Sequence, residues 1–237
     1  MKIEVWSDYQ CPFCYIGKAR LNKALEQFPN RDEVEVSFRS FELDPNAAKD
    51  IPMNMYEMLM NKYGLTLEQV KQNSANLWQQ AKNEGLDFQF DTMVLTNSFD
   101  AHRLLKFAAK QGKEAEMNEA LFRAYFTDSL HIGDHDTLLD IAERVGLDRT
   151  ETQTFLNSEQ LGKEVRQDEQ QANQLGVTGV PFFVVNNKYG ISGAQPTEVF
   201  LNTLQDVWAE DHPLQMINST EGDVCVDGSC IVPDQKS

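Results

Sequence analysis

Cys11 and Cys14 are the residues best suited to chemistry in this chain. They lie three apart in the stretch VWSDYQCPFCYIGKARLNKAL, residues 5–25, where a short apolar run gives way to a helical pattern. Two thiols one helical turn apart can close a disulfide when the second attacks a mixed disulfide on the first. The spacing alone also allows half of a metal site or two small core residues. Two-electron thiol exchange is the chemistry that it suits best.

The strand and helix expected around the two cysteines decide where each thiol lies and which way it points. Residues 2–6 alternate polar and apolar side chains, which predicts a short strand followed by a connecting loop. Pro12 fits the first position of a helix, where its missing N–H would have no partner anyway. A thiolate at Cys11 would then be stabilised by the free N–H groups at the helix N-terminus. Cys14 would point inward, on the face that continues with Leu21, Leu25 and Phe28.

The next segments predict half of a sheet and then a long helical block. Val34, Val36 and Phe38 alternate in a second strand within residues 34–43, which gives a right-handed parallel β-α-β unit. Helical periodicity then runs from about residue 53 to 176. The expected helix boundaries are capping boxes at Thr66/Gln69 and Thr150/Gln153 and C-terminal caps at Gly112, Gly146 and Gly176.

Strand character returns late in the chain. The run VPFFVVNNKYGISG, residues 180–193, predicts a hairpin with an Asn-Asn turn, and Pro196 opens a further helix. The stretch from about residue 211 to 237 is polar and without periodicity, which predicts a tail or loop that carries Cys225 and Cys230.

Length and charge exclude several classes of protein. At 237 residues with 41% apolar content, the chain can bury a real core. A net charge of −16 repels phosphate backbones and anionic lipid, so we expect no nucleic-acid and no membrane partner. No apolar run approaches the length of about 20 residues that spans a bilayer, and no signal peptide is visible. We therefore expect a cytoplasmic protein, in which four cysteines are poor candidates for a static disulfide framework.

Three motifs carry a resemblance to a known family. WSDYQCPFCYIG, NSFDAHRLLKFA and LGVTGVPFFVVNNKYGISGAQP occur in an order that resembles the FrnE branch of the DsbA-like thioredoxin superfamily. The resemblance implies an α/β thioredoxin fold with a large all-helical insertion between the second strand and the cis-proline strand. The domains that follow are a discontinuous thioredoxin-like domain, 1–48 and 177–210, an inserted helical domain, 49–176, and a C-terminal tail, 211–237.

The same resemblance implies roles for individual residues. Cys11 matches the attacking cysteine of the family and Cys14 the resolving cysteine. Val180-Pro181 matches the cis-proline dipeptide that faces the active-site disulfide, where Val180 would offer backbone groups to an incoming peptide. Pro12 and Phe13 would border the bound substrate. No metal and no cofactor is implied.

Cys225 and Cys230, in CVDGSC, form a second pair with two open interpretations. FrnE-type members that resemble this chain carry such a pair. It could close a small disulfide loop in the tail, or it could act as an auxiliary redox pair that exchanges with Cys11 and Cys14.

Several other residues are weaker candidates. Glu4 could shuttle the proton of the resolving thiol, although a surface strand position is the preferred interpretation. Asn97, His102 and Arg103 belong to a stretch that the resemblance places near the site, without a catalytic role. The methionines at positions 53, 55, 58 and 60 fit an amphipathic helix that fills the core, or a groove for flexible polypeptides.

The sequence thus predicts a thiol-disulfide oxidoreductase or isomerase that acts on protein thiols and disulfides, with glutathione or another reductant as a possible partner. One alternative is a glutathione-dependent transferase or isomerase of the kappa and 2-hydroxychromene-2-carboxylate isomerase type. Members of that branch place serine where Cys11 stands, so an intact CPFC weighs against it. A second alternative is a non-catalytic protein in which all four cysteines bind zinc.

Overall fold

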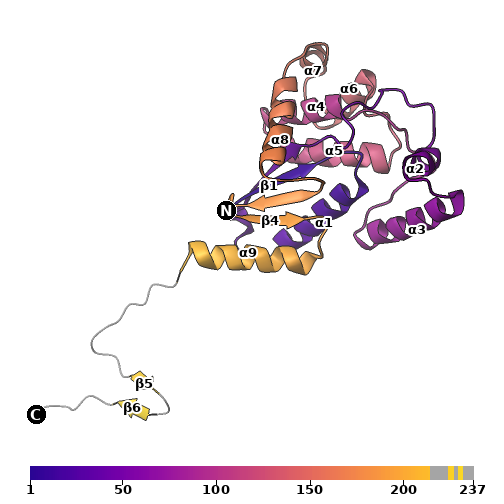
Figure 1. Cartoon of the computed structure of the whole chain (residues 1–237). Coiled ribbons are helices and arrows are strands. Elements are labelled where there is room, and N and C mark those ends of the chain that lie inside the picture. Colours follow the sequence, from indigo (N-terminus) through magenta and orange to yellow (C-terminus); the bar gives the residue numbers. More distant parts are fainter. Residues whose placement is uncertain (214–223, 227–228, 232–237) are drawn as a thin grey trace, which may run out of the picture.

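The computed structural model covers the chain of 237 residues and describes residues 1–213, 224–226 and 229–231. A mixed sheet of four strands and the helices around it make up the part before residue 213 (Figure 1). None of the helices in the described residues is long and apolar enough to cross a bilayer.

The sheet has the order β2-β1-β3-β4. Strand β1, Lys2–Ser7, pairs in parallel with β2, Glu35–Ser40, from Lys2 opposite Glu35 to Ser7 opposite Ser40. Helix α1, Pro12–Gln27, connects the two strands, with a single 3-10 turn, Arg31–Glu33, before β2. The parallel β-α-β unit expected from the sequence is confirmed.

A hairpin completes the sheet on the other side of β1. Strand β3, Phe182–Val185, runs antiparallel to β1 and pairs with β4, Tyr189–Ser192. Asn186 and Asn187 both adopt positive φ, at 49° and 55°, as the central residues of a tight turn in which the N–H of Lys188 donates to the carbonyl oxygen of Val185 at 3.0 Å. The expected Asn-Asn turn is confirmed.

Helices cover both faces of the sheet (Figure 1). On one face α1 packs against α9, Thr197–Asp211, over a core that includes Ile3, Phe183 and Phe200. On the other face Trp6 and Val184 pack against Ala172 of α8, Gly162–Gln174. The alternation of side chains along β1 therefore separates two cores.

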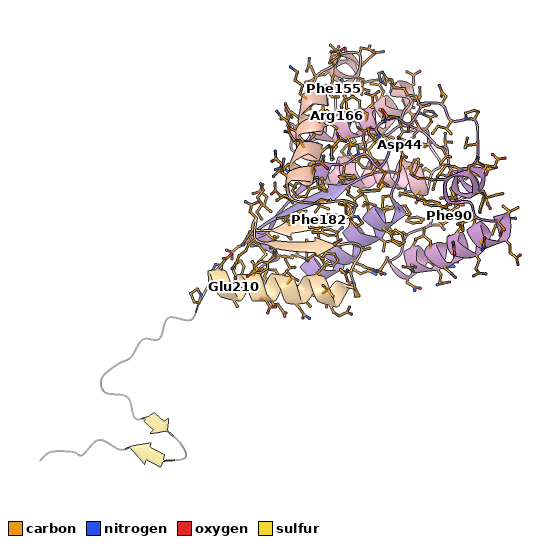
Figure 2. All side chains as sticks on the ribbon, in the orientation of Figure 1. Asp44, Phe90, Phe155, Arg166, Phe182 and Glu210 are labelled. Carbon is orange, nitrogen blue, oxygen red and sulfur yellow. The ribbon has the colours of Figure 1, made fainter. Side chains whose placement is uncertain are left out.

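The segment between β2 and β3 is helical, as expected. It contains α2, Met55–Tyr63, α3, Leu67–Asn83, α4, Phe99–Ala109, α5, Glu114–Phe126, α6, His135–Arg144, and α7, Arg149–Leu156, before α8. Side chains fill the space between these helices (Figure 2), where Phe155 stacks on Phe107 with ring centroids 4.4 Å apart. The division of the chain into domains at residues 48 and 176 remains a prediction.

The helix ends confirm some expected caps and correct others. Thr66 and Gln69 form the predicted capping box of α3. The box predicted at Thr150 and Gln153 is wrong, because α7 begins two residues earlier and Asp148 caps it by accepting the N–H of Glu151. Pro196 precedes α9 as its N-cap residue and does not occupy the first helical position.

The tail contains a short hairpin that the sequence analysis did not predict. Strands β5, Val224–Val226, and β6, Ser229–Ile231, pair antiparallel with Cys225 opposite Cys230. Backbones of directly opposed residues lie about 4.5 to 5.5 Å apart, a separation that a disulfide can bridge. The rest of the predicted tail, residues 214–223, 227–228 and 232–237, lies outside the described residues.

Candidate active site

Cys11 and Cys14 lie at the start of α1, at the end of β1. Cys11 is the N-cap residue, and its N–H donates to the carbonyl oxygen of Asp8 at 3.0 Å. The N–H of Cys14 donates to the carbonyl oxygen of Cys11, also at 3.0 Å. Both thiols are free, with Cys11 5% and Cys14 2% exposed. The expected placement of Cys11 at the helix N-terminus and of Cys14 inside it is confirmed.

The protein environment keeps Cys14 protonated. Burial raises the pKa of the Cys14 thiol well above its ordinary value, and the hydrogen bond and charge of Cys11 raise it further. A hydrogen bond from the Asp8 backbone lowers this pKa by a smaller amount, and the Asp8 charge raises it. Cys14 is therefore a thiol at neutral pH, and it can act as a nucleophile only after its proton has been removed.

The Val180-Pro181 dipeptide faces Cys11 across the fold. Its peptide bond is cis, as the resemblance implied, and the Cys11 sulfur lies 3.5 Å from the Val180 carbonyl oxygen. The β1–β3 ladder ends at Trp6 and Phe182, so the peptide groups of Val180 lie beyond its last pair. A Cβ atom at Gly17 would lie 3.1 Å from the Pro181 ring, so glycine lets α1 approach Pro181 this closely.

An apolar groove opens beside the CPFC segment. Its volume is about 320 Å³, and α2, α3 and the start of α1 line it. We call it the methionine groove because Met55, Met58 and Met93 contribute to its wall. Lys62 is its only charged lining residue within the described part of the chain. Phe13 stands at this wall with 45% of its surface exposed, so the groove reaches the cysteine pair.

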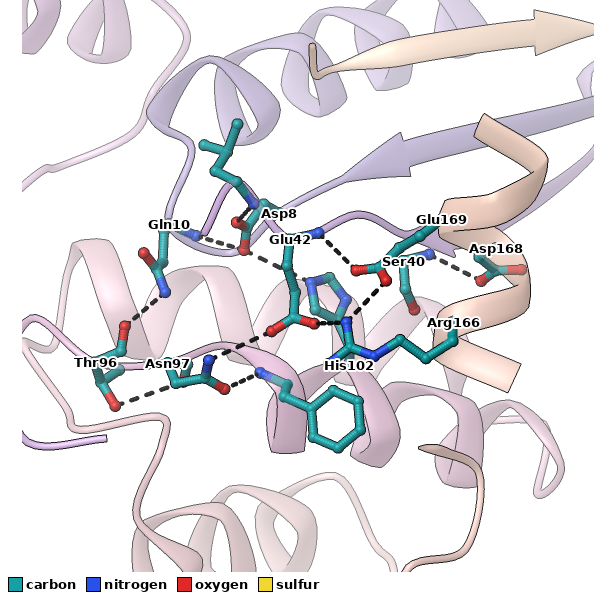
Figure 3. A network of polar contacts seen from close by, with 12 residues as sticks. Asp8, Gln10, Ser40, Glu42, Thr96, Asn97, His102, Arg166, Asp168 and Glu169 are labelled. Carbon is teal, nitrogen blue, oxygen red and sulfur yellow. Dashed lines mark hydrogen bonds and ion pairs between the residues drawn. The ribbon is translucent and has the colours of Figure 1, made fainter. Parts of the chain in front are cut away.

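Asp8 is a buried carboxylate between β1 and the cysteines, and sequence reasoning missed it. It is 0% exposed and accepts the N–H of Leu43 at 2.7 Å and the N–H of Gln10 at 3.2 Å (Figure 3). The Nε2 atom of His102, on α4, lies 3.6 Å from Asp8 Oδ1. A charged residue three positions before Cys11 was the available signal in the sequence.

Glu4 does not occupy the surface position that the sequence analysis preferred. It is buried on β1, where Arg39 of β2 donates to its carboxylate at 3.0 Å. Burial alone would raise the pKa of Glu4, but the hydrogen bond and charge of Arg39, with Lys2, hold it below its usual value. The Glu4 carboxylate is thus committed to a salt bridge.

Asn97, His102 and Arg103, the three candidates in and before α4, do not all contact the same group of residues. His102 lies beside Asp8, and Asn97 donates to Glu42 at 3.4 Å. Arg103 instead binds Asp100 at 2.7 Å and the carbonyl oxygen of Gln160 at 2.9 Å, within the helical segment. Only the first two therefore belong to the polar network of Figure 3.

The side chains of Cys225 and Cys230 lie outside the described residues, so their exchange with Cys11 and Cys14 remains a prediction. Within the described side chains, no group of three or more His, Cys, Asp or Glu residues has the arrangement of a metal site. The zinc site formed by all four cysteines is not tested by this observation, because it needs the side chains of Cys225 and Cys230.

Comparison with known proteins identifies the family. Residues 2–205 match the DSBA-like thioredoxin domain. The chain belongs to this family. The uncharacterized protein YwbO of Bacillus subtilis is 30% identical over 212 residues, covering 86% of this chain and 96% of its own length.

Two solved structures show how far the likeness extends. A probable DsbA oxidoreductase from Streptomyces coelicolor is 44% identical, with a TM-score of 0.86 and coverage of 99% of this chain and 100% of its own. A 2-hydroxychromene-2-carboxylate isomerase is 16% identical with a TM-score of 0.69, and the match covers 91% of this chain and 100% of the isomerase. The latter likeness shows the fold alone.

These findings confirm the predicted thioredoxin fold with a helical insertion. They also support thiol-disulfide oxidoreductase activity at the level of the family. The FrnE branch and the cytoplasmic location remain predictions.

Proposed function

We propose that this protein is a thiol-disulfide oxidoreductase that exchanges disulfides with polypeptides through Cys11 and Cys14. The observation that carries the proposal is the position of the Cys11 sulfur, 3.5 Å from the Val180 carbonyl oxygen and at the N-terminus of α1. The thiolate is the reactive form of cysteine in such an exchange. Cys14 lies one turn further into the protein, where it can reach a sulfur bonded to Cys11.

The exchange has two steps. The Cys11 thiolate attacks one sulfur of a substrate disulfide, which forms a mixed disulfide and releases the other substrate sulfur as a thiolate. Cys14 then loses its proton and attacks the Cys11 sulfur, so the Cys11–Cys14 bond forms and the second substrate thiolate leaves. The protein pair is oxidised by two electrons and the substrate is reduced; the reverse sequence installs a disulfide. Glutathione or another small thiol would reset the pair.

Two surfaces are available to a polypeptide substrate. The peptide groups of Val180, beyond the β1–β3 ladder, can pair with an extended segment, and Pro181 has no N–H to compete. The methionine groove can take an apolar side chain near the reacting cysteine, since flexible thioethers adapt to varied shapes. Pro12 and Phe13, which belong to the groove wall, would contact the same segment.

Trapping of the mixed disulfide tests the proposed chemistry. A Cys14→Ser variant can make the first attack but cannot resolve it, so incubation with oxidised insulin should accumulate a covalent adduct that dithiothreitol releases. A Cys11→Ser variant should form no adduct at this motif. Both variants need Cys225→Ser and Cys230→Ser, so that the second pair does not react. Equal adduct in the two variants would contradict the assigned roles.

A matched pair of methionine variants tests the groove. Met58→Glu places a carboxylate on the groove wall, whereas Met53→Glu changes an exposed methionine that does not line it. Burying the charge should raise KM for insulin about tenfold in the Met58 variant. KM for oxidised glutathione, which is too polar to use an apolar groove, should stay within about twofold. Equal effects of the two variants on insulin would rule out the groove as a substrate surface.

A further inference from the structure

Exposed apolar side chains surround the opening of the methionine groove. Of the seven large hydrophobic side chains that are exposed in the described residues, three line this groove: Phe13, Leu43 and Tyr63. Single exposed apolar residues are ordinary on a protein surface, but several around one cavity indicate a binding surface. A volume of about 320 Å³ is at the lower end of the range for ligand sites, which suits one large side chain.

Two hydroxyl groups interrupt the apolar lining of the groove. Tyr125, on α5, is 2% exposed, and Ser74, on α3, is 7% exposed, and both line the cavity. The buried Tyr15 hydroxyl donates to Glu119, but these two hydroxyls have no hydrogen-bond partner among the described residues. Neither oxygen is enclosed by protein on every side, as the hydroxyl of Tyr9 is, so each can meet a molecule that enters the cavity.

The Tyr125 hydroxyl is a neutral group that can donate or accept a hydrogen bond. Burial raises its pKa above the ordinary value, and the charge of Asp8 raises it further, so the proton stays on at neutral pH. A side chain that enters the groove displaces water from this hydroxyl. If the side chain brings no polar atom, the hydroxyl is left without a partner, and affinity is lost. A site of this kind discriminates against an occupant that lacks the matching hydroxyl.

The lining also disfavours the other classes of side chain. Lys62, the only charged lining residue in the described part of the chain, would repel lysine and arginine. A carboxylate would lose its hydration against the apolar wall. Leucine, methionine and phenylalanine fit the wall but leave both hydroxyls unpaired, and the tryptophan N–H can only donate. Tyrosine combines a flat apolar ring with a hydroxyl that both donates and accepts.

We infer that the methionine groove selects a tyrosine side chain of the substrate polypeptide, whose hydroxyl forms hydrogen bonds with Tyr125 and Ser74. The ring would pack against Phe90, which Figure 2 labels, and against the flexible thioethers of Met58 and Met93. The inference rests on the proposed function, because the groove receives a substrate residue only if Cys11 exchanges disulfides with polypeptides. The helical segment between β2 and β3 would then choose the substrate on which the cysteine pair acts.

Short peptides that contain one cysteine test this selectivity. The cysteine is coupled to nitrothiobenzoate through a disulfide, and tyrosine, phenylalanine or glycine is placed in turn at each of the neighbouring positions. The Cys11 thiolate attacks the peptide sulfur, so a bond from Cys11 to the peptide forms, the old disulfide breaks, and nitrothiobenzoate leaves as a coloured thiolate. The reference is the full-length chain with Cys14→Ser, Cys225→Ser and Cys230→Ser, in which only Cys11 reacts. Rates with free glutathione correct for the intrinsic reactivity of each peptide.

At the position that reaches the groove, the tyrosine peptide should react about tenfold faster than the phenylalanine peptide at low peptide concentration. Tyr125→Phe should reduce this ratio to about one. Ser74→Ala should reduce it to about threefold, because Ser74 also borders a second cavity, where water can still reach its hydroxyl. The matched control is Tyr9→Phe, which removes a buried hydroxyl outside the groove and should keep the ratio near tenfold.

The glycine peptide separates the two levels of the argument. A reference protein that does not react with the glycine peptide would refute the proposed exchange itself. A reference protein that reacts with all three peptides, but equally fast with tyrosine and phenylalanine at every position, would overturn the inference and leave the exchange standing. A tenfold ratio that persists in both Tyr125→Phe and Ser74→Ala would overturn it as well, because the selectivity would then come from another surface.

Discussion

Two buried tyrosines that pack on the same phenylalanine should respond in opposite directions to loss of the hydroxyl group. The rings of Tyr9 and Tyr15 lie 4.9 and 5.0 Å from the ring of Phe122, so the two side chains share one apolar neighbour. The Tyr9 hydroxyl has no hydrogen-bond partner among the described residues. The Tyr15 hydroxyl donates to Glu119.

The magnitudes follow from these contacts. A buried polar atom without a partner costs about 1 to 3 kcal/mol of desolvation, so Tyr9→Phe should raise the free energy of unfolding by about 1 kcal/mol. Tyr15→Phe removes a hydrogen bond to a charged group, worth about 1.5 to 3 kcal/mol when fully buried. Glu119 is half exposed and keeps Lys18 as a partner, so the loss should be nearer about 1 kcal/mol.

Urea unfolding at pH 7, followed by far-ultraviolet circular dichroism, measures both changes on the same scale. The free energies of unfolding of the two variants should differ by about 2 kcal/mol, and the dependence of each on urea concentration should be unchanged. Tm should move by about 2 to 4 °C for each kcal/mol. A Tyr9→Phe variant less stable than the parent by about 1 kcal/mol or more would refute the reasoning, because the hydroxyl would then have a partner in the folded protein.

Other contacts lead to further predictions. Burial alone would raise the pKa of Asp100, but hydrogen bonds from neighbours that include Lys49 lower it to about 2. Its stabilisation, about 2 kcal/mol, is therefore present above pH 4 and lost as pH falls toward 2, a dependence that Asp100→Asn should remove in acid unfolding curves. Glu4→Gln weakens the salt bridge with Arg39 and should cost about 1 to 2 kcal/mol of unfolding free energy in urea; an unchanged urea midpoint would mean that this pair does not stabilise the sheet. Thr66→Ala removes the cap of α3 and should cost about 1 kcal/mol, seen as faster amide exchange in its first turn; unchanged exchange would mean that packing, not the cap, holds this end.

Local patterns explain why the frame of the site could be predicted from the sequence. Period-two alternation before Cys11, and Pro12 after it, are sufficient to predict the strand, the helix and the inward direction of Cys14. The Asn-Asn turn could also be predicted from the sequence, because asparagine tolerates positive φ. The cis bond at Pro181 came from family resemblance, since nothing local in the sequence separates cis from trans there.

The missed features depend on partners that are distant in sequence. Asp8 is held by Leu43 and faces His102, so its burial follows from the packing of the helical segment against the end of β1. Glu4 was misjudged for the same reason, because its partner Arg39 becomes a neighbour only through the register of β1 and β2.

Two errors were local. Asp148 and Thr150 both precede an acidic or amide side chain by three residues, and the pattern does not say which one ends the preceding loop. The hairpin around Cys225 was overlooked although Asp-Gly between two short apolar runs is a hairpin signal.

The reduction potential of the Cys11–Cys14 pair tests the central claim most directly. The full-length protein and the Cys225→Ser, Cys230→Ser variant would be equilibrated in glutathione buffers, and the oxidised fraction measured by thiol trapping and Trp6 fluorescence. We predict a reversible two-electron transition in both, with a potential between about −270 and −120 mV, the range spanned by thioredoxin and DsbA. No transition in either protein, together with zinc that survives dialysis of the full-length chain, would contradict the account and establish a four-thiolate metal site in its place.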